Sequence, residues 1–106
     1  MYETLDSGGR KDYPSGMNRD DTTGKPRYDL IPVPMLKRLA ELYARGAEKY
    51  GDRNWELADS EEELERFKAS CMRHMFQWHV GETDEDHAIA TIWNIIAYEV
   101  TREKLK

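Results

Sequence analysis

The sequence predicts an all-α fold: a helical bundle that is preceded by an irregular N-terminal arm and assembled as an oligomer. Apolar residues recur at helical spacing in three segments after Pro32. Residues that start and stop helices bound these segments, and no segment alternates apolar and polar residues as a strand does. The 106 residues fit a single domain. We divide it into an arm over residues 1–32 and a helical core over residues 33–106.

The arm is predicted from its lack of any sustained period and from its helix-breaking residues. It contains most of the glycines and prolines of the chain, at Gly8, Gly9, Pro14, Gly16, Gly24, Pro26 and Pro32.

The first helix is predicted over about residues 33–49, where Gly51 provides a stop. Gly46 costs roughly 1 kcal/mol relative to alanine inside a helix. It therefore indicates either a close approach by another helix or a ligand, or a frayed last turn. The apolar stripe of this helix is Leu36, Leu39, Ala40, Tyr43, Ala47 and Tyr50.

The second helix is predicted to begin at Ser60, because Ser60-Glu61-Glu62-Glu63 has the spacing of a capping box. Gly81 ends it. We interpret Trp78 as a core residue, since an aromatic residue at helical spacing is usually buried. The predicted buried stripe is Leu64, Phe67, Cys71, Met75 and Trp78.

The third helix is predicted to open at Thr83-Asp84-Glu85-Asp86, with Thr83 as the cap and the acids at the positive end of the helix dipole. Its predicted buried stripe is Ile89, Ile92, Trp93, Ile96 and Val100.

The composition restricts the class of protein. A formal charge of −5 argues against a duplex nucleic-acid surface, which requires a basic face. The single Cys71 cannot form an internal disulfide, and the N-terminus resembles neither a signal peptide nor a membrane span, so we expect the cytoplasm. With 39% hydrophobic residues, the core of a monomer would be thin, and we expect a homodimer or homotetramer.

Acidic residues on two predicted helices form a candidate site for Mg²⁺ or Mn²⁺. Glu41 and Glu48 are seven residues apart and therefore share one side of a helix. Asp86 lies at the start of the third helix, and Glu82 lies one turn before it if that helix begins early. Carboxylate oxygens on facing helices suit hard cations. The alternative is that these acids form a solvated face and a helix cap.

Other residue types point to phosphate, to a base or to zinc. Lys25, Arg27, Lys49 and Arg73 are candidate contacts for phosphate oxygens, and Tyr50, Trp55 and Trp78 are candidates for stacking on a base. A zinc site at Cys71, His74, His79 and His87 is a weaker interpretation, because the histidines lack a compact ligand spacing and Cys71 lies in an apolar stripe.

Several motifs together resemble a known family. They are Gly24-Lys25-Pro26-Arg27-Tyr28-Asp29-Leu30-Ile31-Pro32, Gly46-Ala47-Glu48-Lys49-Tyr50-Gly51-Asp52-Arg53-Asn54-Trp55, Arg73-His74, Gly81-Glu82, and His87 with Trp93-Asn94. Over roughly residues 15–98 the chain resembles the phage dATP/dGTP diphosphohydrolase (MazZ-like) family of the MazG-like all-α nucleoside triphosphate pyrophosphohydrolases.

The resemblance implies a helical bundle that binds Mg²⁺ or Mn²⁺ through carboxylates and releases pyrophosphate from purine deoxynucleoside triphosphates. It implies that Glu41, Glu82 and Asp86 are the catalytic acids of the metal site, and we expect Glu48 or Asp84 as a further metal ligand. Five residues match family motif positions near this site: Lys49, Asn54, Arg73, His74 and Asn94. Lys25, Arg27 and Trp55 complete the expected substrate-binding residues because of their suitability for phosphate or a base.

Two other functional classes are less consistent with the sequence. A non-enzymatic acidic adaptor or nucleic-acid mimic accounts for the charge, but it does not account for the loop Lys49–Trp55 or for the arm residues Lys25 and Arg27. A phosphohydrolase of the His-Asp type would need a second His-Asp cluster, which the sequence lacks.

Overall fold

The structure is a computed structural model, and it describes residues 8–21 and 23–106 of the chain. The chain divides into two compact units, the first ending at Ile31 and the second extending from Pro32 to Lys106. The part of the predicted arm at residues 1–7 and 22 lies outside the described residues.

The first unit contains a small antiparallel hairpin that the sequence did not predict. Strand β1, Arg10–Asp12, pairs with β2, Asn18–Asp20, so that Arg10 lies opposite Asp20. The connecting turn is closed by bonds from the Tyr13 amide to the Met17 carbonyl and from the Gly16 amide to the Tyr13 carbonyl. Both strands are short and polar, so no alternation of apolar residues reveals them. A 3₁₀ turn, η1, follows at Tyr28–Leu30.

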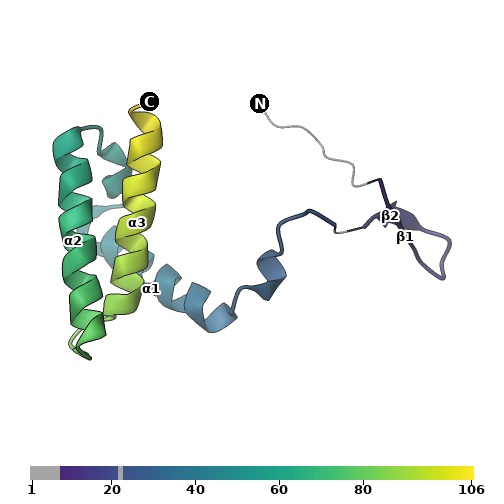
Figure 1. The fold of residues 1–106 in the computed structure, drawn as a ribbon, viewed down its shortest axis with the longest axis horizontal. Helices are drawn as coiled ribbons and strands as arrows, with labels where there is room; N and C mark the ends of the chain where they lie inside the picture. The colour runs from purple at the N-terminus through teal and green to yellow at the C-terminus, as the bar shows by residue number, and fades with distance from the viewer. Residues whose placement is uncertain (1–7, 22) are drawn as a thin grey trace. The chain divides into compact units, whose positions relative to one another are not determined.

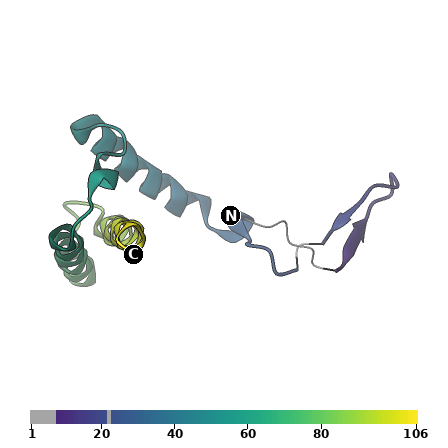
Figure 2. The same cartoon turned by 90° about the horizontal axis from the view of Figure 1, so that it is seen from above.

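The second unit contains the three predicted helices: α1 at Val33–Tyr50, α2 at Glu61–His79 and α3 at His87–Lys104. A 3₁₀ turn, η2, occupies Asn54–Leu57. The all-α fold class is therefore confirmed, with the hairpin as an addition. Figure 1 shows α2 and α3 side by side and antiparallel, and Figure 2 looks along them and shows α1 running across the pair.

Helix ends follow local chemistry. Gly51 ends α1 with a φ of 94°, which is unfavourable for residues with a Cβ atom. The capping box of α2 is present: the Ser60 hydroxyl accepts a bond from the Glu63 amide, and the Glu63 carboxylate accepts bonds from the Ser60 hydroxyl and the Asp59 amide. The prediction that Thr83 caps the third helix is wrong. The cap is Asp86, whose carboxylate accepts a bond from the Ile89 amide.

The core is thin and lies mainly between α2 and α3. Its buried apolar residues include Leu64 of α2 and Ile89 of α3, whereas α1 has no buried residue. Because α1 crosses the pair, one part of its stripe stays uncovered. Trp78, predicted to be core, is 58% exposed because it lies in the last turn of α2, just before the connecting loop. The other predicted core residues that are exposed are Leu36, Ala40, Tyr50, Met75, Ile92 and Val100.

None of the helices among residues 8–21 and 23–106 is both long and apolar enough to cross a membrane.

Candidate functional site

A cavity of about 1180 Å³ lies within the second unit. Its lining comes from the C-terminal half of α1, the loop through η2, and the facing parts of α2 and α3. Gly46 lines it, and a Cβ atom added there would meet no other atom within 4 Å. This glycine therefore does not mark a close helix contact.

Aromatic rings from four elements form one part of the cavity lining. Trp55 of η2 lies 6.1 Å from Tyr43 of α1 and 6.0 Å from Trp93 of α3, measured between ring centroids. Phe67 of α2 meets the Trp93 ring edge-to-face at 6.0 Å. Burial, together with nearby Glu56, raises the pKa of the Tyr43 hydroxyl, so it stays protonated. Such a cluster offers planar apolar surface to a flat ligand.

Arginine side chains line the same cavity. Arg66 and Arg73 are seven residues apart on α2 and therefore share a side of that helix. Arg53 precedes η2 in a left-handed conformation with φ 58°. Guanidinium groups are suited to paired hydrogen bonds with phosphate or carboxylate oxygens. The cavity therefore combines a stacking surface with anion donors, although Glu63 and Glu85 also line it.

Five of the predicted substrate-binding residues line this cavity: Asn54, Trp55, Arg73, His74 and Asn94. Asn94 is buried, and its amide Nδ2 donates to the Ala90 carbonyl oxygen at 2.8 Å.

Three other predicted substrate-binding residues lie elsewhere. The Lys49 ammonium lies 5.3 Å from the centroid of the Tyr50 ring, and Lys49 is not part of the cavity lining. Lys25 and Arg27 belong to the first unit, where the Arg27 guanidinium donates two bonds to the Asp29 carboxylate. Their roles remain predictions.

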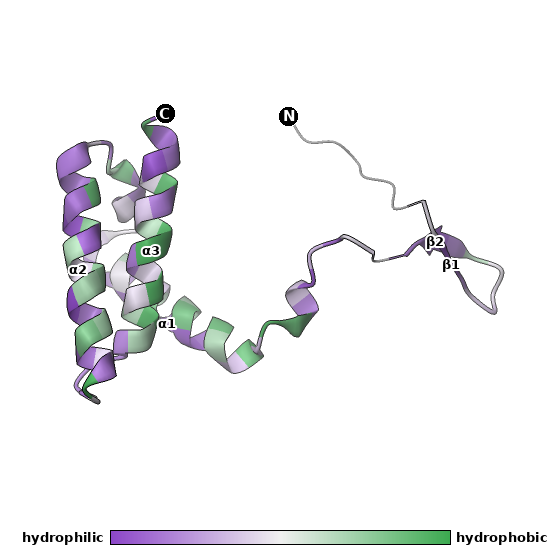
Figure 3. Ribbon diagram, viewed as in Figure 1, coloured by the Kyte–Doolittle hydropathy of each residue, from purple (hydrophilic) through white to green (hydrophobic). Residues whose placement is uncertain are grey.

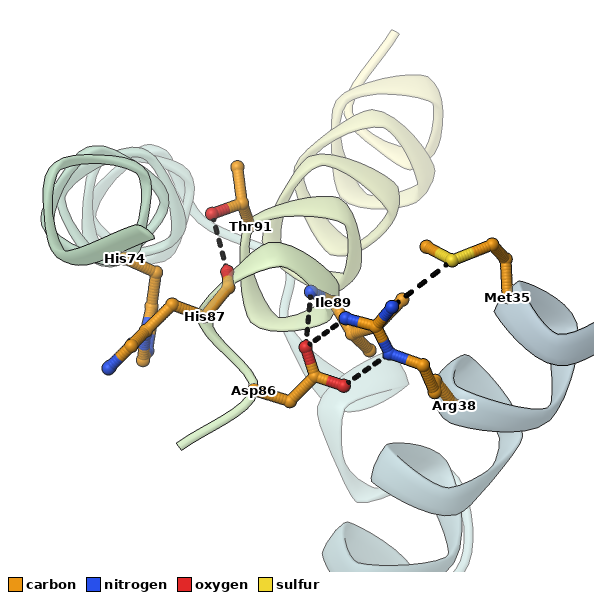
Figure 4. A network of polar contacts seen from close by, with 7 residues as sticks. All are labelled: Met35, Arg38, His74, Asp86, His87, Ile89 and Thr91. Carbon is orange, nitrogen blue, oxygen red and sulfur yellow. Dashed lines mark hydrogen bonds and ion pairs between the residues drawn. The ribbon is translucent and has the colours of Figure 1, made fainter. Parts of the chain in front are cut away.

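The Asp86 carboxylate, a predicted metal ligand, is held by an arginine. Arg38 of α1 donates from Nε at 2.8 Å and from Nη2 at 2.7 Å, and Figure 4 shows this fork beside the start of α3. The pair lowers the pKa of Asp86 and raises that of Arg38. In this structure the Asp86 carboxylate therefore links α1 to α3.

The structure brings together two groups of possible metal-ligand atoms among the described residues: His74 with Glu85 and His87, and Glu82 with Asp84 and His87. In each group these atoms lie within 4.8 Å of one another. Of the predicted ligands for Mg²⁺ or Mn²⁺, Glu82 and the possible further ligand Asp84 belong to one of them. Of the four residues in the zinc interpretation, His74 and His87 belong to these groups. Glu41 and Glu48 lie on exposed positions of α1, and Asp86 lines a smaller cavity together with Glu82.

The two buried histidines contact each other. His74 Nδ1 lies 2.9 Å from His87 Nδ1, and His87 Nε2 lies 2.7 Å from an Asp84 carboxylate oxygen. Burial lowers the pKa of His74, and the bond from His87 lowers the pKa of Asp84. Burial raises the pKa of the Cys71 thiol, which fits its interpretation as a packing residue and not a nucleophile.

Three residues of these sites were not predicted from the sequence. Arg66 lines the cavity and could have been found from its seven-residue spacing to Arg73. Arg53, which also lines the cavity, lies inside one of the motifs that resemble the family. Glu85 was assigned only to the helix start, and the sequence carries no signal that it lies beside His74.

The fold and this site define a small all-α domain with an aromatic and basic cavity next to carboxylate and imidazole groups. Residues 15–105 match the family described as dATP/dGTP diphosphohydrolase, N-terminal, and the chain belongs to this family. Comparison with curated proteins gave no match, and comparison with solved structures gave none either. The match confirms the family that the sequence motifs indicated.

Proposed function

We propose that the chain is a metal-dependent pyrophosphohydrolase that converts dATP and dGTP to the monophosphate and pyrophosphate. The observation that carries this proposal is the cavity, which places a stacking surface and arginines together in a member of a family named for this substrate class. In the reaction a water oxygen bonds to the α-phosphorus. The bond from that phosphorus to the bridging oxygen breaks, and pyrophosphate leaves with the bonding electrons.

The base of the nucleotide would bind against the aromatic cluster. Trp55 lies in a short 3₁₀ turn and not within a long helix, so its ring can adjust to a ligand more easily than the rings of Phe67 or Trp93. Stacking against an aromatic side chain contributes about 1–3 kcal/mol per base. Asn54 and Asn94 line the same cavity and are suited to hydrogen bonds with a base edge or the sugar.

The triphosphate would bind to Arg53, Arg66 and Arg73. The chain as a whole carries −5, so the polyanion gains nothing from the net charge of the protein. The guanidinium groups in the cavity supply positive charge locally and so offset the unfavourable net charge of the protein. Lys25, Arg27 and Lys49 stay predictions from the sequence.

A divalent ion is expected beside the phosphates, and the donors present fit Mg²⁺ or Mn²⁺. Glu82 and Asp84 are exposed carboxylates within one group of possible ligand atoms, and oxygen donors of this kind suit both ions. They are the residues that would bind the ion, with Glu41, Glu48 and Asp86 as further ligands expected from the sequence. When bound, the ion neutralises phosphate charge and polarises the phosphorus-oxygen bond.

The direct experiment is to incubate the protein separately with dATP, dGTP, dCTP and dTTP in the presence of Mg²⁺ or Mn²⁺. Formation of monophosphate and pyrophosphate from the purine substrates, abolished by EDTA, supports the proposal. Absence of both turnover and nucleotide-dependent thermal stabilisation with either ion points instead to the alternative of a non-enzymatic adaptor.

The role of Trp55 gives a sharper prediction. Trp55→Ala should raise KM for dATP or dGTP about tenfold, with a smaller change in kcat, because stacking is made in both the bound substrate and the transition state. Initial rates over a range of substrate concentrations measure this. Tyr98→Ala is the matched control, because Tyr98 does not line the cavity and should leave KM unchanged.

We also propose that the protein works as a homodimer or homotetramer in the cytoplasm. Apolar side chains are exposed on α2 and α3, and Figure 3 shows hydrophobic residues on the visible faces of both helices. Burying such surface between subunits would complete a core that one chain leaves thin.

A further inference from the structure

Two buried imidazole rings meet at the point where α2 passes the start of α3. His74 is 8% exposed and His87 is 2% exposed, and their Nδ1 atoms are 2.9 Å apart. Figure 4 shows both side chains reaching the same place from the two elements. Two buried imidazole nitrogens this close need either an N–H of one ring that donates to the other ring or a cation that both nitrogens bind.

The neighbouring carboxylate fixes how His87 presents its lone pair. Its Nε2 lies 2.7 Å from the Asp84 carboxylate oxygen, so Nε2 carries the proton and donates it. The lone pair of neutral His87 is then on Nδ1 and faces His74. A carboxylate bound to the far nitrogen of a histidine is the usual outer support of a metal-ligating imidazole.

Glu85 supplies a third donor. One of its carboxylate oxygens lies within 4.8 Å of the ligand atoms of both histidines. Two nitrogens 2.9 Å apart subtend about 90° at an ion that is about 2.0–2.1 Å from each, which is the angle between neighbouring ligands of an octahedral or square arrangement.

The charges around the pair also suit a cation. Glu85 and Asp84 act on His74 as negative charges, whereas Arg73 and a protonated His87 act on it as positive charges. When His87 binds an ion through its lone pair it carries no charge of its own, and two carboxylates then stand against one guanidinium, which favours a cation.

We propose that His74, His87 and Glu85 bind one divalent transition-metal ion of the imidazole-preferring kind, such as Co²⁺, Ni²⁺ or Zn²⁺. Nitrogen donors favour these ions over Mg²⁺, which selects oxygen donors. His74 and Glu85 line the large cavity, so the remaining coordination positions of the ion are available to a ligand there. The ion would also tie α2 to the start of α3. The argument for this site does not rest on the proposed hydrolysis of nucleotides, but the two sites share residues: Asp84, which supports His87, also belongs to the group proposed for Mg²⁺ or Mn²⁺.

The test uses full-length protein without an affinity tag, stripped with EDTA and titrated with Co²⁺ in the absence of nucleotide. The expected result is visible d–d absorption that saturates at one Co²⁺ per chain, disappears when Zn²⁺ is added and persists in excess Mg²⁺. Absence of these bands, or saturation only by weak binding that Mg²⁺ displaces, overturns the proposal.

Variants identify the ligands. His74→Gln and His87→Gln should abolish the bands. His79→Gln is the matched control, because His79 is the remaining histidine of the chain and is exposed at the end of α2. Bands that survive in His87→Gln overturn the assignment.

If circular dichroism shows that the histidine variants do not fold, the proposal is tested instead with substitutions at the exposed residues Asp84 and Glu85. Glu85→Gln should weaken Co²⁺ binding, and Asp84→Asn should weaken it about 10- to 100-fold without changing the stoichiometry. Unchanged affinity in both variants overturns the proposal. Hydrolysis of dATP with Mg²⁺ alone is measured separately, so loss of Co²⁺ binding and loss of the proposed activity are distinguishable.

Discussion

Asp86 shows how one side chain can have a local and a long-range role. Its carboxylate caps α3 through the Ile89 amide and accepts the fork of Arg38 from α1. The sequence resemblance implies a metal-binding role for it. In this structure the carboxylate fixes the start of one helix and the position of another, so a change of its charge should affect the fold itself.

The pKa shift of Asp86 predicts how stability depends on pH. The ion pair with Arg38 lowers its pKa in the folded protein below the unfolded value of about 3.9. Its contribution is therefore fully present above that unfolded value and is lost as the pH falls through the lower folded pKa. Thermal unfolding followed between pH 2 and pH 6 should show a smaller acid-induced loss in Asp86→Asn than in the unmodified protein. Equal losses would show that the carboxylate is unimportant for stability.

Ser60, unlike Asp86, stabilises only the helix that it caps. Its hydroxyl accepts from the Glu63 amide at 3.2 Å and donates to the Glu63 carboxylate at 2.7 Å. Ser60→Ala should lower the free energy of unfolding by about 1 kcal/mol, because one helix donor loses its partner. Urea denaturation measures the change. Ser60→Thr keeps a capping hydroxyl and should recover most of the stability.

Among the helices of the described residues, α2 and α3 pack against each other most closely, and α1 is the least covered of the three α-helices. Leu64 and Ile89 are buried, whereas no residue of α1 is buried. The cavity is lined partly by α1 and the loop that follows it. The crossing of α1 therefore makes room for the cavity but leaves part of its apolar stripe exposed.

The different packing of the two faces of α3 can be tested with a matched pair of isoleucines. Ile89 is 1% exposed, and Ile89→Ala should cost about 3 kcal/mol, since it removes buried methyl groups and leaves a void. Ile95 is 49% exposed, and Ile95→Ala should cost less than about 1 kcal/mol at protein concentrations that favour the monomer. Similar losses in chemical denaturation would contradict the packing described for α3.

At the scale of the whole molecule, several large apolar side chains are not covered by the core and stay exposed to water. Phe76 is 59% exposed on α2, and Met72 is exposed one turn before it. A single chain therefore leaves contiguous apolar surface in water, which favours association.

The proposed assembly predicts a clear effect of charge at this surface. Phe76→Asp should shift the protein toward the monomer, because a carboxylate buried between subunits would lose its hydration. Size-exclusion chromatography with light scattering measures the mass. Glu65→Gln, at an exposed polar position of the same helix, is the control and should leave the mass unchanged. A monomeric unmodified protein would contradict the proposal.

Much of the fold could be predicted because its evidence is local. The spacing of Leu64, Phe67 and Cys71, the capping box at Ser60 and the stop at Gly51 depend only on residues within a few positions of one another. For the same reason the start of α3 was misplaced. Thr83 and Asp86 are both acceptable caps locally, and the contact of Asp86 with Arg38 comes from another helix.

The candidate site was predictable only in part. Asn54, Trp55, Arg73, His74 and Asn94 were predicted from the sequence, and they do line one cavity. The sequence motifs gave no sign that Glu85 lies beside His74, or that Asp86 is paired with an arginine. Side chains far apart in the sequence meet only when helices have packed.

The sequence by itself determined the helical class, the approximate helix bounds and the family. The helical period, the capping residues and the short sequence motifs are all properties of neighbouring positions. Only the tertiary structure decided that α1 crosses the other two helices, that an aromatic and basic cavity forms beside them, and that His74 and His87 face each other in the interior. The physical reason is that these features depend on how rigid helices pack, and packing is set by shape and burial over the whole domain and not by any single segment.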